Sequence, residues 1–151
     1  MKLIYLALVL ILNLQAFSQN ADIPKWSIKQ LEKHIEGSKK PIIVNFWATF
    51  CKPCIEEIPY FQEAIKSYKE QGVELLLVSL DLFSFYPDKI RDFANKRGFT
   101  APIVFLDESD ADYFCPVIDS SWSGAIPATV FINNKTGYRK FHEEQLSPEQ
   151  L

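Results

Sequence analysis

The sequence is poor in the residues that most nucleotide, metal and nucleic-acid sites require. It has five glycines and contains neither a G-x-G-x-x-G motif nor a P-loop, which argues against a nucleotide-binding site. Two histidines and three cysteines are too few for most zinc sites or for a disulfide scaffold, so we expect no metal and no cofactor. The net charge of -3 argues against nucleic-acid binding, which requires an excess of positive charge. The 151 residues, 48% of them hydrophobic, suit one folded domain with a compact chemical motif.

The first residues predict a secretory signal peptide. Lys2 precedes an apolar run over residues 3–12, and the small residues Ala16 and Ser18 stand at the −3 and −1 positions of a cleavage site after Ser18. The run is shorter than the roughly twenty apolar residues that span a bilayer, so we favour cleavage over an uncleaved membrane anchor. We therefore expect a signal peptide over residues 1–18 and a domain over residues 19–151 that is exported across the inner membrane to the periplasm.

Hydrophobic periodicity along the rest of the chain predicts an α/β fold. Ser27 and Gln30 form a capping box that precedes the first helical pattern. The pattern predicts helices from residue 28 up to Gly37 and over residues 51–71 and 87–98. It predicts strands over residues 42–47, 73–80, 103–106, 129–132 and 138–141. We expect an irregular, solvated acidic stretch after residue 106, and a C-terminal helix that begins near Ser147 and is cut short by the end of the chain. The predicted architecture is one central mixed sheet with helices on both faces.

A C-x-x-C motif lies at the junction between a buried strand and an amphipathic helix. Cys51 opens the helix, where free backbone N–H groups favour the thiolate, and Cys54 lies one turn further on. Lys52 adds a positive charge, and Pro53 lacks an N–H where the helix does not need one. This arrangement predicts that Cys51 attacks a disulfide and that Cys54 resolves the mixed disulfide.

Other uses of the two cysteines fit less well. Zinc needs a second pair of ligands, which the sequence lacks, and haem attachment needs a histidine where Ile55 stands. A purely structural disulfide is a third reading, but closing so short a loop removes little chain entropy.

Two motifs resemble the thioredoxin superfamily. Residues 44–54 (VNFWATFCKPC), followed by Glu57 and Pro59, resemble its active-site segment, and Ile126-Pro127-Ala128-Thr129 resembles the loop that carries its cis-proline. Together the motifs are most similar to secreted TlpA/ResA-like thiol-disulfide oxidoreductases, many of which serve cytochrome c maturation. The resemblance covers residues 41–141 and implies a thioredoxin-like fold.

The resemblance also implies roles for individual residues. Cys51 matches the attacking cysteine and Cys54 the resolving one, while the loop of Pro127 presents the Ile126 backbone to a substrate segment. Phe50 stands where the family usually has Trp and keeps a flat apolar cover for substrate.

Two polar positions also follow from the resemblance. Glu57 matches an acidic residue that tunes the thiols or contacts the partner; the alternative is a solvated carboxylate beside Glu56. Asn45 replaces the buried Asp of cytoplasmic thioredoxins, which removes their usual proton acceptor.

Several other residues have two interpretations from sequence. Trp122 either lines the substrate groove or belongs to the core, and Cys115 is either a further redox group or, as we favour, a buried small hydrophobe. Asp81, at a strand end, is a weak candidate for proton transfer. His34 and His142 lack partners at metal-ligand spacing, and we expect both at the surface.

The sequence thus predicts a monomeric thiol-disulfide oxidoreductase. Its expected partners are a disulfide-containing secreted protein, such as apocytochrome c, and a membrane protein that returns electrons. Lys52 favours an oxidising dithiol, whereas Pro53 resembles the reducing thioredoxins. The direction of electron transfer is therefore inferred from the family resemblance, which favours a reductase. The alternatives are a thioredoxin-like binding module or holdase with an incidental dithiol, and a peroxide-reducing enzyme, for which no supporting Thr and Arg cluster is evident.

Overall fold

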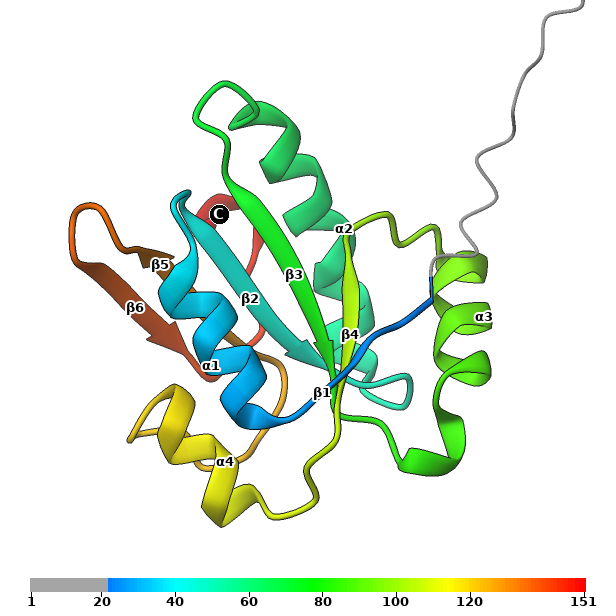
Figure 1. Cartoon of the computed structure of the whole chain (residues 1–151). Coiled ribbons are helices and arrows are strands. Elements are labelled where there is room, and N and C mark those ends of the chain that lie inside the picture. Colours follow the sequence, from blue (N-terminus) through cyan, green and yellow to red (C-terminus); the bar gives the residue numbers. More distant parts are fainter. Residues whose placement is uncertain (1–21) are drawn as a thin grey trace, which may run out of the picture.

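The computed structural model describes residues 22–151 (Figure 1). The predicted signal peptide and its alternative, a membrane anchor, lie outside these residues. Within residues 22–151, no helix is both long enough and apolar enough to cross a bilayer.

A six-stranded sheet with the strand order β1-β4-β3-β2-β5-β6 forms the centre of the molecule. Its strands are β1 (Lys25–Trp26), β2 (Ile42–Trp47), β3 (Glu74–Ser79), β4 (Ile103–Leu106), β5 (Ala128–Asn133) and β6 (Tyr138–His142). The first four strands are parallel to one another, whereas β5 is antiparallel to β2 and β6 is antiparallel to β5. The predicted mixed sheet is confirmed.

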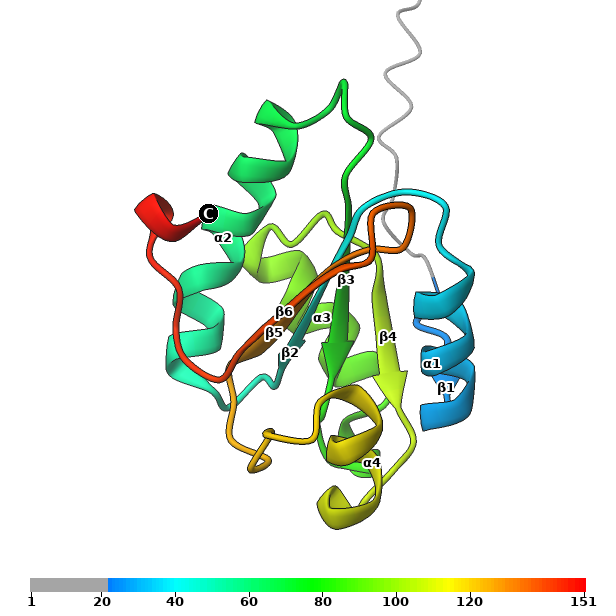
Figure 2. The same cartoon turned by 90° about the vertical axis from the view of Figure 1, so that its left-hand side faces the viewer.

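Helices cover both faces of this sheet, as predicted (Figure 2). They are α1 (Ile28–Gly37), α2 (Lys52–Ser67), α3 (Asp88–Arg97) and α4 (Ala111–Ile118), with short 3-10 turns at η1 (Phe83–Phe85) and η2 (Pro148–Gln150). Helices α1 and α4 pack on one face, and α2 and α3 on the other. Every residue of β2 is buried because the strand is central and covered on both faces, which explains its unbroken apolar run.

One strand and one α-helix were not predicted from the sequence. Strand β1 has only two residues, which is too short for a periodic signal. The stretch predicted to be irregular contains α4, whose Phe114, Cys115 and Ile118 are buried against the sheet.

The acidic residues before α4 are not simply solvated. Asp107 forms an ion pair with Lys25 at 3.2 Å, and Glu108 accepts a hydrogen bond from the Ile28 N–H at 3.1 Å. These carboxylates tie the segment before α4 to β1 and to the first turn of α1.

Three connections meet at one edge of the sheet. Strands β2 and β3 run parallel and end together, with Trp47 beside Ser79 in the register. Strand β5 runs the other way, so that its first residue, Ala128, pairs with Phe46 near the end of β2. The loops after β2 and β3 and the loop before β5 therefore lie at the same edge (Figure 1). The C-x-x-C motif is in the first of them.

Candidate active site

The two cysteines of the motif are joined as a disulfide at the beginning of α2. Cys51 is the N-cap residue of the helix, and the Cα atoms of Cys51 and Cys54 are 5.3 Å apart. The backbone N–H of Cys54 donates to the Cys51 Sγ at 3.3 Å. The helix N-terminus thus points a donor at the sulfur that has to carry negative charge after reduction, an arrangement that stabilises a thiolate.

Solvent reaches the two cysteines unequally. Cys51 is 7% exposed and Cys54 is fully buried. Of the two residues, Cys51 is thus the one that solvent reaches, and the roles of attacking and resolving cysteine stay a prediction.

The two residues between the cysteines differ in their surroundings. The Lys52 side chain is 86% exposed, and its Nζ lies 3.7 Å from a carboxylate oxygen of Glu56. Its charge is therefore shared with Glu56 and screened by solvent. Pro53 occupies the first turn of α2, where a missing N–H costs no helical hydrogen bond.

The loop before β5 carries a cis peptide bond between Ile126 and Pro127, as the resemblance implied. Pro127 is buried and Ile126 is half-buried, next to the residue that pairs with the end of β2. The Ile126 backbone thus lies in the loop beside the dithiol segment. Phe50 is 67% exposed at the same edge, so its ring is free to contact a bound molecule.

Trp122 belongs to the core rather than to a substrate groove. It is 5% exposed, and its ring packs against Phe46 and Phe114 at centroid distances of 4.5 and 5.7 Å. Its Nε1–H donates to the Ala125 carbonyl at 2.8 Å. The Trp122 side chain therefore contacts the loop before β5 through this hydrogen bond. Of its two interpretations, the structure supports the one in the core.

Glu57 is fully buried, so the interpretation as a solvated carboxylate is wrong. One carboxylate oxygen accepts from the Asn45 Nδ2 at 2.8 Å, and the other from the Leu146 N–H at 2.7 Å. Burial raises the pKa of Glu57 to about 7, although both hydrogen bonds oppose this rise. Because Cys54 and Glu57 are three residues apart on α2, a carboxyl group that can exchange a proton near neutral pH lies on the same helix face as the resolving cysteine.

The Asp81 carboxylate joins the loops after β2 and β3. It is 6% exposed, and its carboxylate accepts from the Thr49 N–H at 3.0 Å and from the Thr49 Oγ1 at 2.6 Å. The Ser79 Oγ donates to the other oxygen at 2.8 Å. These hydrogen bonds tie the loop after β3 to the loop that carries the dithiol.

The remaining candidates lie outside the site. Cys115 is a free, buried cysteine, and burial, together with Glu143 and Asp112, raises its pKa to about 11, which fits a small hydrophobe. His34 is exposed, as predicted, and packs against Trp26. The side chain of His142 is partly exposed, at 19%, and its Nδ1 lies 3.4 Å from a carboxylate oxygen of Glu144.

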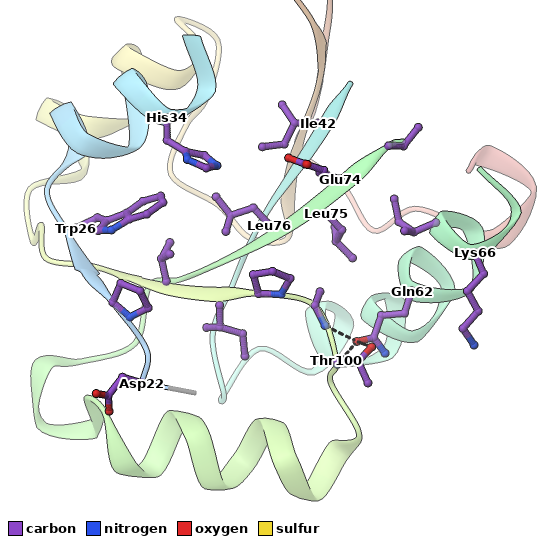
Figure 3. Close-up of a pocket in the computed structure, with 17 residues that line it drawn as sticks. Asp22, Trp26, His34, Ile42, Gln62, Lys66, Glu74, Leu75, Leu76 and Thr100 are labelled. Carbon is purple, nitrogen blue, oxygen red and sulfur yellow. Dashed lines mark hydrogen bonds between the residues drawn. The ribbon is translucent and has the colours of Figure 1, made fainter. Parts of the chain in front are cut away.

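A mostly apolar cavity of about 740 Å³ lies at the opposite edge of the sheet (Figure 3). Its lining includes the first residues of β2, β3 and β4, with Trp26 and His34 from one side and Gln62 and Thr100 from another. None of the residues near the dithiol contributes to it. The cavity is therefore separate from the candidate active site.

Comparisons with known proteins place the chain in a family. A sequence profile of the AhpC/TSA family matches residues 13–137. The chain belongs to this family. Curated relatives include the thiol-disulfide oxidoreductase ResA of Geobacillus thermodenitrificans, which is 33% identical over 112 residues, and ResA of Bacillus subtilis, which is 30% identical over 123 residues. The matches cover 74% and 79% of this chain but only 59% and 64% of the relatives, so the chain spans about three fifths of their length.

Solved structures show that this member of the family has a thioredoxin-like fold. A thioredoxin-related protein from Neisseria meningitidis serogroup B aligns with a TM-score of 0.64 and 26% identity, over 77% of this chain and 83% of that one. StoA from Bacillus subtilis aligns with a TM-score of 0.54 and 25% identity, over 76% and 81% of the two chains. The fold that the sequence motifs implied is confirmed.

Proposed function

We propose that this protein is a thiol-disulfide oxidoreductase that reduces disulfide bonds in exported proteins through Cys51 and Cys54. The observation that carries the proposal is the dithiol itself, with Cys51, 7% exposed, at a helix N-terminus and a fully buried Cys54 one turn away. The ResA relatives, named as thiol-disulfide oxidoreductases, support the same activity.

The reaction consists of two exchange steps. The Cys51 thiolate attacks one sulfur of the substrate disulfide, which forms a mixed disulfide and releases the other substrate sulfur as a thiolate that takes up a proton. Cys54 then loses its proton and attacks the Cys51 sulfur, which releases the second substrate thiol and leaves the Cys51–Cys54 disulfide. Two electrons pass to the substrate, and an external dithiol has to return them before the next cycle.

Glu57 is the proposed proton acceptor for Cys54. It lies one helical turn from Cys54, is shielded from solvent, and has a pKa of about 7, so it can take a proton and give it back near neutral pH. Asn45 stands where cytoplasmic thioredoxins have an acidic residue and cannot accept the proton itself. Its Nδ2 donates a hydrogen bond to the Glu57 carboxylate instead.

The proposed setting follows from the sequence. The signal peptide predicted over residues 1–18 supports a periplasmic location, and the TlpA/ResA resemblance supports a role in cytochrome c maturation. The substrate would then be a disulfide-bearing exported protein, such as an apocytochrome c, and a membrane protein would supply electrons to a monomer.

Substitution of each cysteine tests the proposal. We expect Cys51→Ser to abolish the acceleration that the protein gives to the reduction of insulin disulfides by dithiothreitol. In the absence of dithiothreitol, Cys54→Ser should accumulate mixed disulfides with insulin that appear as a mass increase under non-reducing conditions. Cys115→Ser, outside the site, is the matched control. An active Cys51→Ser protein would refute the mechanism.

The reduction potential of the Cys51–Cys54 pair tests the direction. A value near roughly −270 mV supports a reductase, whereas a value near roughly −120 mV makes the protein a disulfide donor. A protein with no reversible couple would leave only a binding module on this fold.

A further inference from the structure

The carboxylate of Glu143, the residue directly after β6, contacts the loop that leads into β5. Its Oε1 accepts hydrogen bonds from the Ser123 N–H and from the Ala125 N–H, both at 3.0 Å, and from the Ser123 hydroxyl. Its Oε2 lies 3.2 Å from the same Ser123 nitrogen. One carboxylate thus binds three donors of the loop, and hydrogen bonds to a charged acceptor are stronger than those to a neutral one.

The sheet register brings Glu143 to this loop. Strands β5 and β6 are antiparallel, and His142 lies opposite Thr129. The chain that leaves β6 after His142 therefore runs beside the residues that come before Thr129, which include the cis residue Pro127. The contact thus joins the end of the last strand to the loop that lies beside the dithiol segment.

Both backbone groups of Ala125 are bound by other parts of the protein. Its N–H donates to Glu143, and its carbonyl accepts from the Nε1–H of the buried Trp122 at 2.8 Å. Gly124, just before it, has a φ of 95°, in the region that favours glycine. The peptide groups on either side of Ala125 are therefore both fixed in direction, one by Glu143 and the other by Trp122.

Ile126, the next residue, has free backbone groups. Among residues 22–151, neither its N–H nor its carbonyl has a hydrogen-bond partner. Because Ile126 precedes a proline, its own conformation is restricted to the extended region. Its N–H belongs to the same planar peptide group as the Ala125 carbonyl, so the contacts of Ala125 set the direction in which this free donor points. Free N–H and carbonyl groups in an extended segment are what a second extended segment needs for strand-like pairing.

We propose that Glu143 is a positioning residue for peptide substrates: it fixes Ala125 so that the free backbone groups of Ile126 are aligned for pairing with the segment that carries the substrate disulfide. The inference rests on the proposed oxidoreductase function and adds a residue that favours disulfides within a peptide chain. A small disulfide without peptide groups cannot pair with Ile126, so its reduction depends on the two cysteines and is independent of Glu143.

Three substitutions of Glu143 separate the reach of the side chain from its charge. Glu143→Ala removes all three hydrogen bonds to the loop. Glu143→Asp keeps the charge, but its side chain is one methylene shorter and cannot keep all three contacts. Glu143→Gln loses the charge and keeps an oxygen at the same distance. The matched control is Glu144→Gln, which removes the same charge from the next residue, whose carboxylate lies 3.4 Å from His142 Nδ1.

Two substrates read the role of the loop: a synthetic peptide with an intramolecular disulfide, and hydroxyethyl disulfide, which has no peptide group. The second-order rate constant for reduction by the reduced protein is measured for each. We expect Glu143→Ala and Glu143→Asp to lower the rate with the peptide about tenfold, the effect of losing a hydrogen bond to a charged group, and to leave the rate with hydroxyethyl disulfide unchanged. Glu143→Gln should recover most of the peptide rate, and the control should match the native protein with both substrates.

Two results would overturn the role of Glu143 and leave the oxidoreductase function in place. One is a native rate with the peptide in Glu143→Ala and Glu143→Asp. The other is an equal loss with both substrates, which would mean that Glu143 only supports the fold around the dithiol. If Glu143→Ala does not fold, the comparison of Glu143→Asp with Glu143→Gln decides in the same way. A native protein that reduces neither substrate would overturn the proposed function itself.

Discussion

The buried carboxyl group of Glu57 should make the stability of the protein depend on pH. Its pKa is about 7 in the folded protein against an ordinary value of 4.5, because burial disfavours the charged form. The folded protein therefore keeps a proton that the unfolded chain releases above pH 4.5. The stabilising contribution is fully present below the unfolded pKa and is lost as the pH rises through the folded one.

The size of the effect follows from the two pKa values. Each pKa unit corresponds to about 1.36 kcal/mol, so the difference between 4.5 and about 7 amounts to about 3 kcal/mol. Glu57→Gln removes the ionisation and keeps an oxygen that can accept a hydrogen bond from Leu146 or Asn45. Between pH 4 and pH 8.5, we therefore expect the variant to gain about 3 kcal/mol relative to the native protein, the rise being concentrated below pH 7.

Urea denaturation of the oxidised protein, followed by tryptophan fluorescence at pH 4 and pH 8.5, measures this change. All other titrating groups are common to both proteins, so they cancel in the comparison. The matched control is Glu56→Gln, which alters a half-exposed carboxylate on the same helix and should follow the native protein. If the free-energy difference between the Glu57→Gln variant and the native protein were the same at both pH values, the reasoning about Glu57 would be refuted.

Two further substitutions test the framework around the site. Asp81→Asn replaces one of the two carboxylate oxygens that accept hydrogen bonds from Thr49 and Ser79, and so leaves a buried donor unpaired. In urea denaturation it should lower the free energy of unfolding by about 1–3 kcal/mol. Unchanged stability would mean that these hydrogen bonds contribute nothing. Leu31→Ala, at a fully buried position of α1, should cost about 2–5 kcal/mol in the same assay, and a cost below 1 kcal/mol would contradict the packing of α1 on the sheet.

The central strands could be predicted well because strands buried on both faces consist of consecutive apolar residues. Strands β2 and β4 have the predicted bounds, and β3 is one residue shorter at each end. Each is a run of apolar residues, since helices cover both faces of the sheet. Helix α1 was equally plain, because its capping box and its buried Ile28, Leu31 and Ile35 are all local features.

Elements whose stability comes from distant partners could not be predicted in this way. Strand β1 is defined by its pairing with Phe105 and Leu106, far along the chain. Helix α4 lies among acidic residues and has Pro116 inside it, so its local sequence argues against a helix. Its burial against the sheet outweighs that weak propensity.

In the candidate site, too, features with a local sequence pattern could be predicted, and those that depend on distant segments could not. The dithiol could be predicted because its two cysteines lie close together in the sequence. The environment of Glu57 could not, because it is formed by segments that are far apart in the sequence. Cys54, Glu57, Ile58 and Phe61 are the buried residues of α2, at helical spacing, so the position of Glu57 on the inward face could have been read from the sequence. Its hydrogen bond from the Leu146 N–H joins residues 89 positions apart, and no local pattern encodes it. A carboxyl group on an otherwise apolar face, with Asn45 inside the strand beneath it, is costly to bury. That cost is what raises its pKa to about 7, the range that the proposed proton transfer from Cys54 requires.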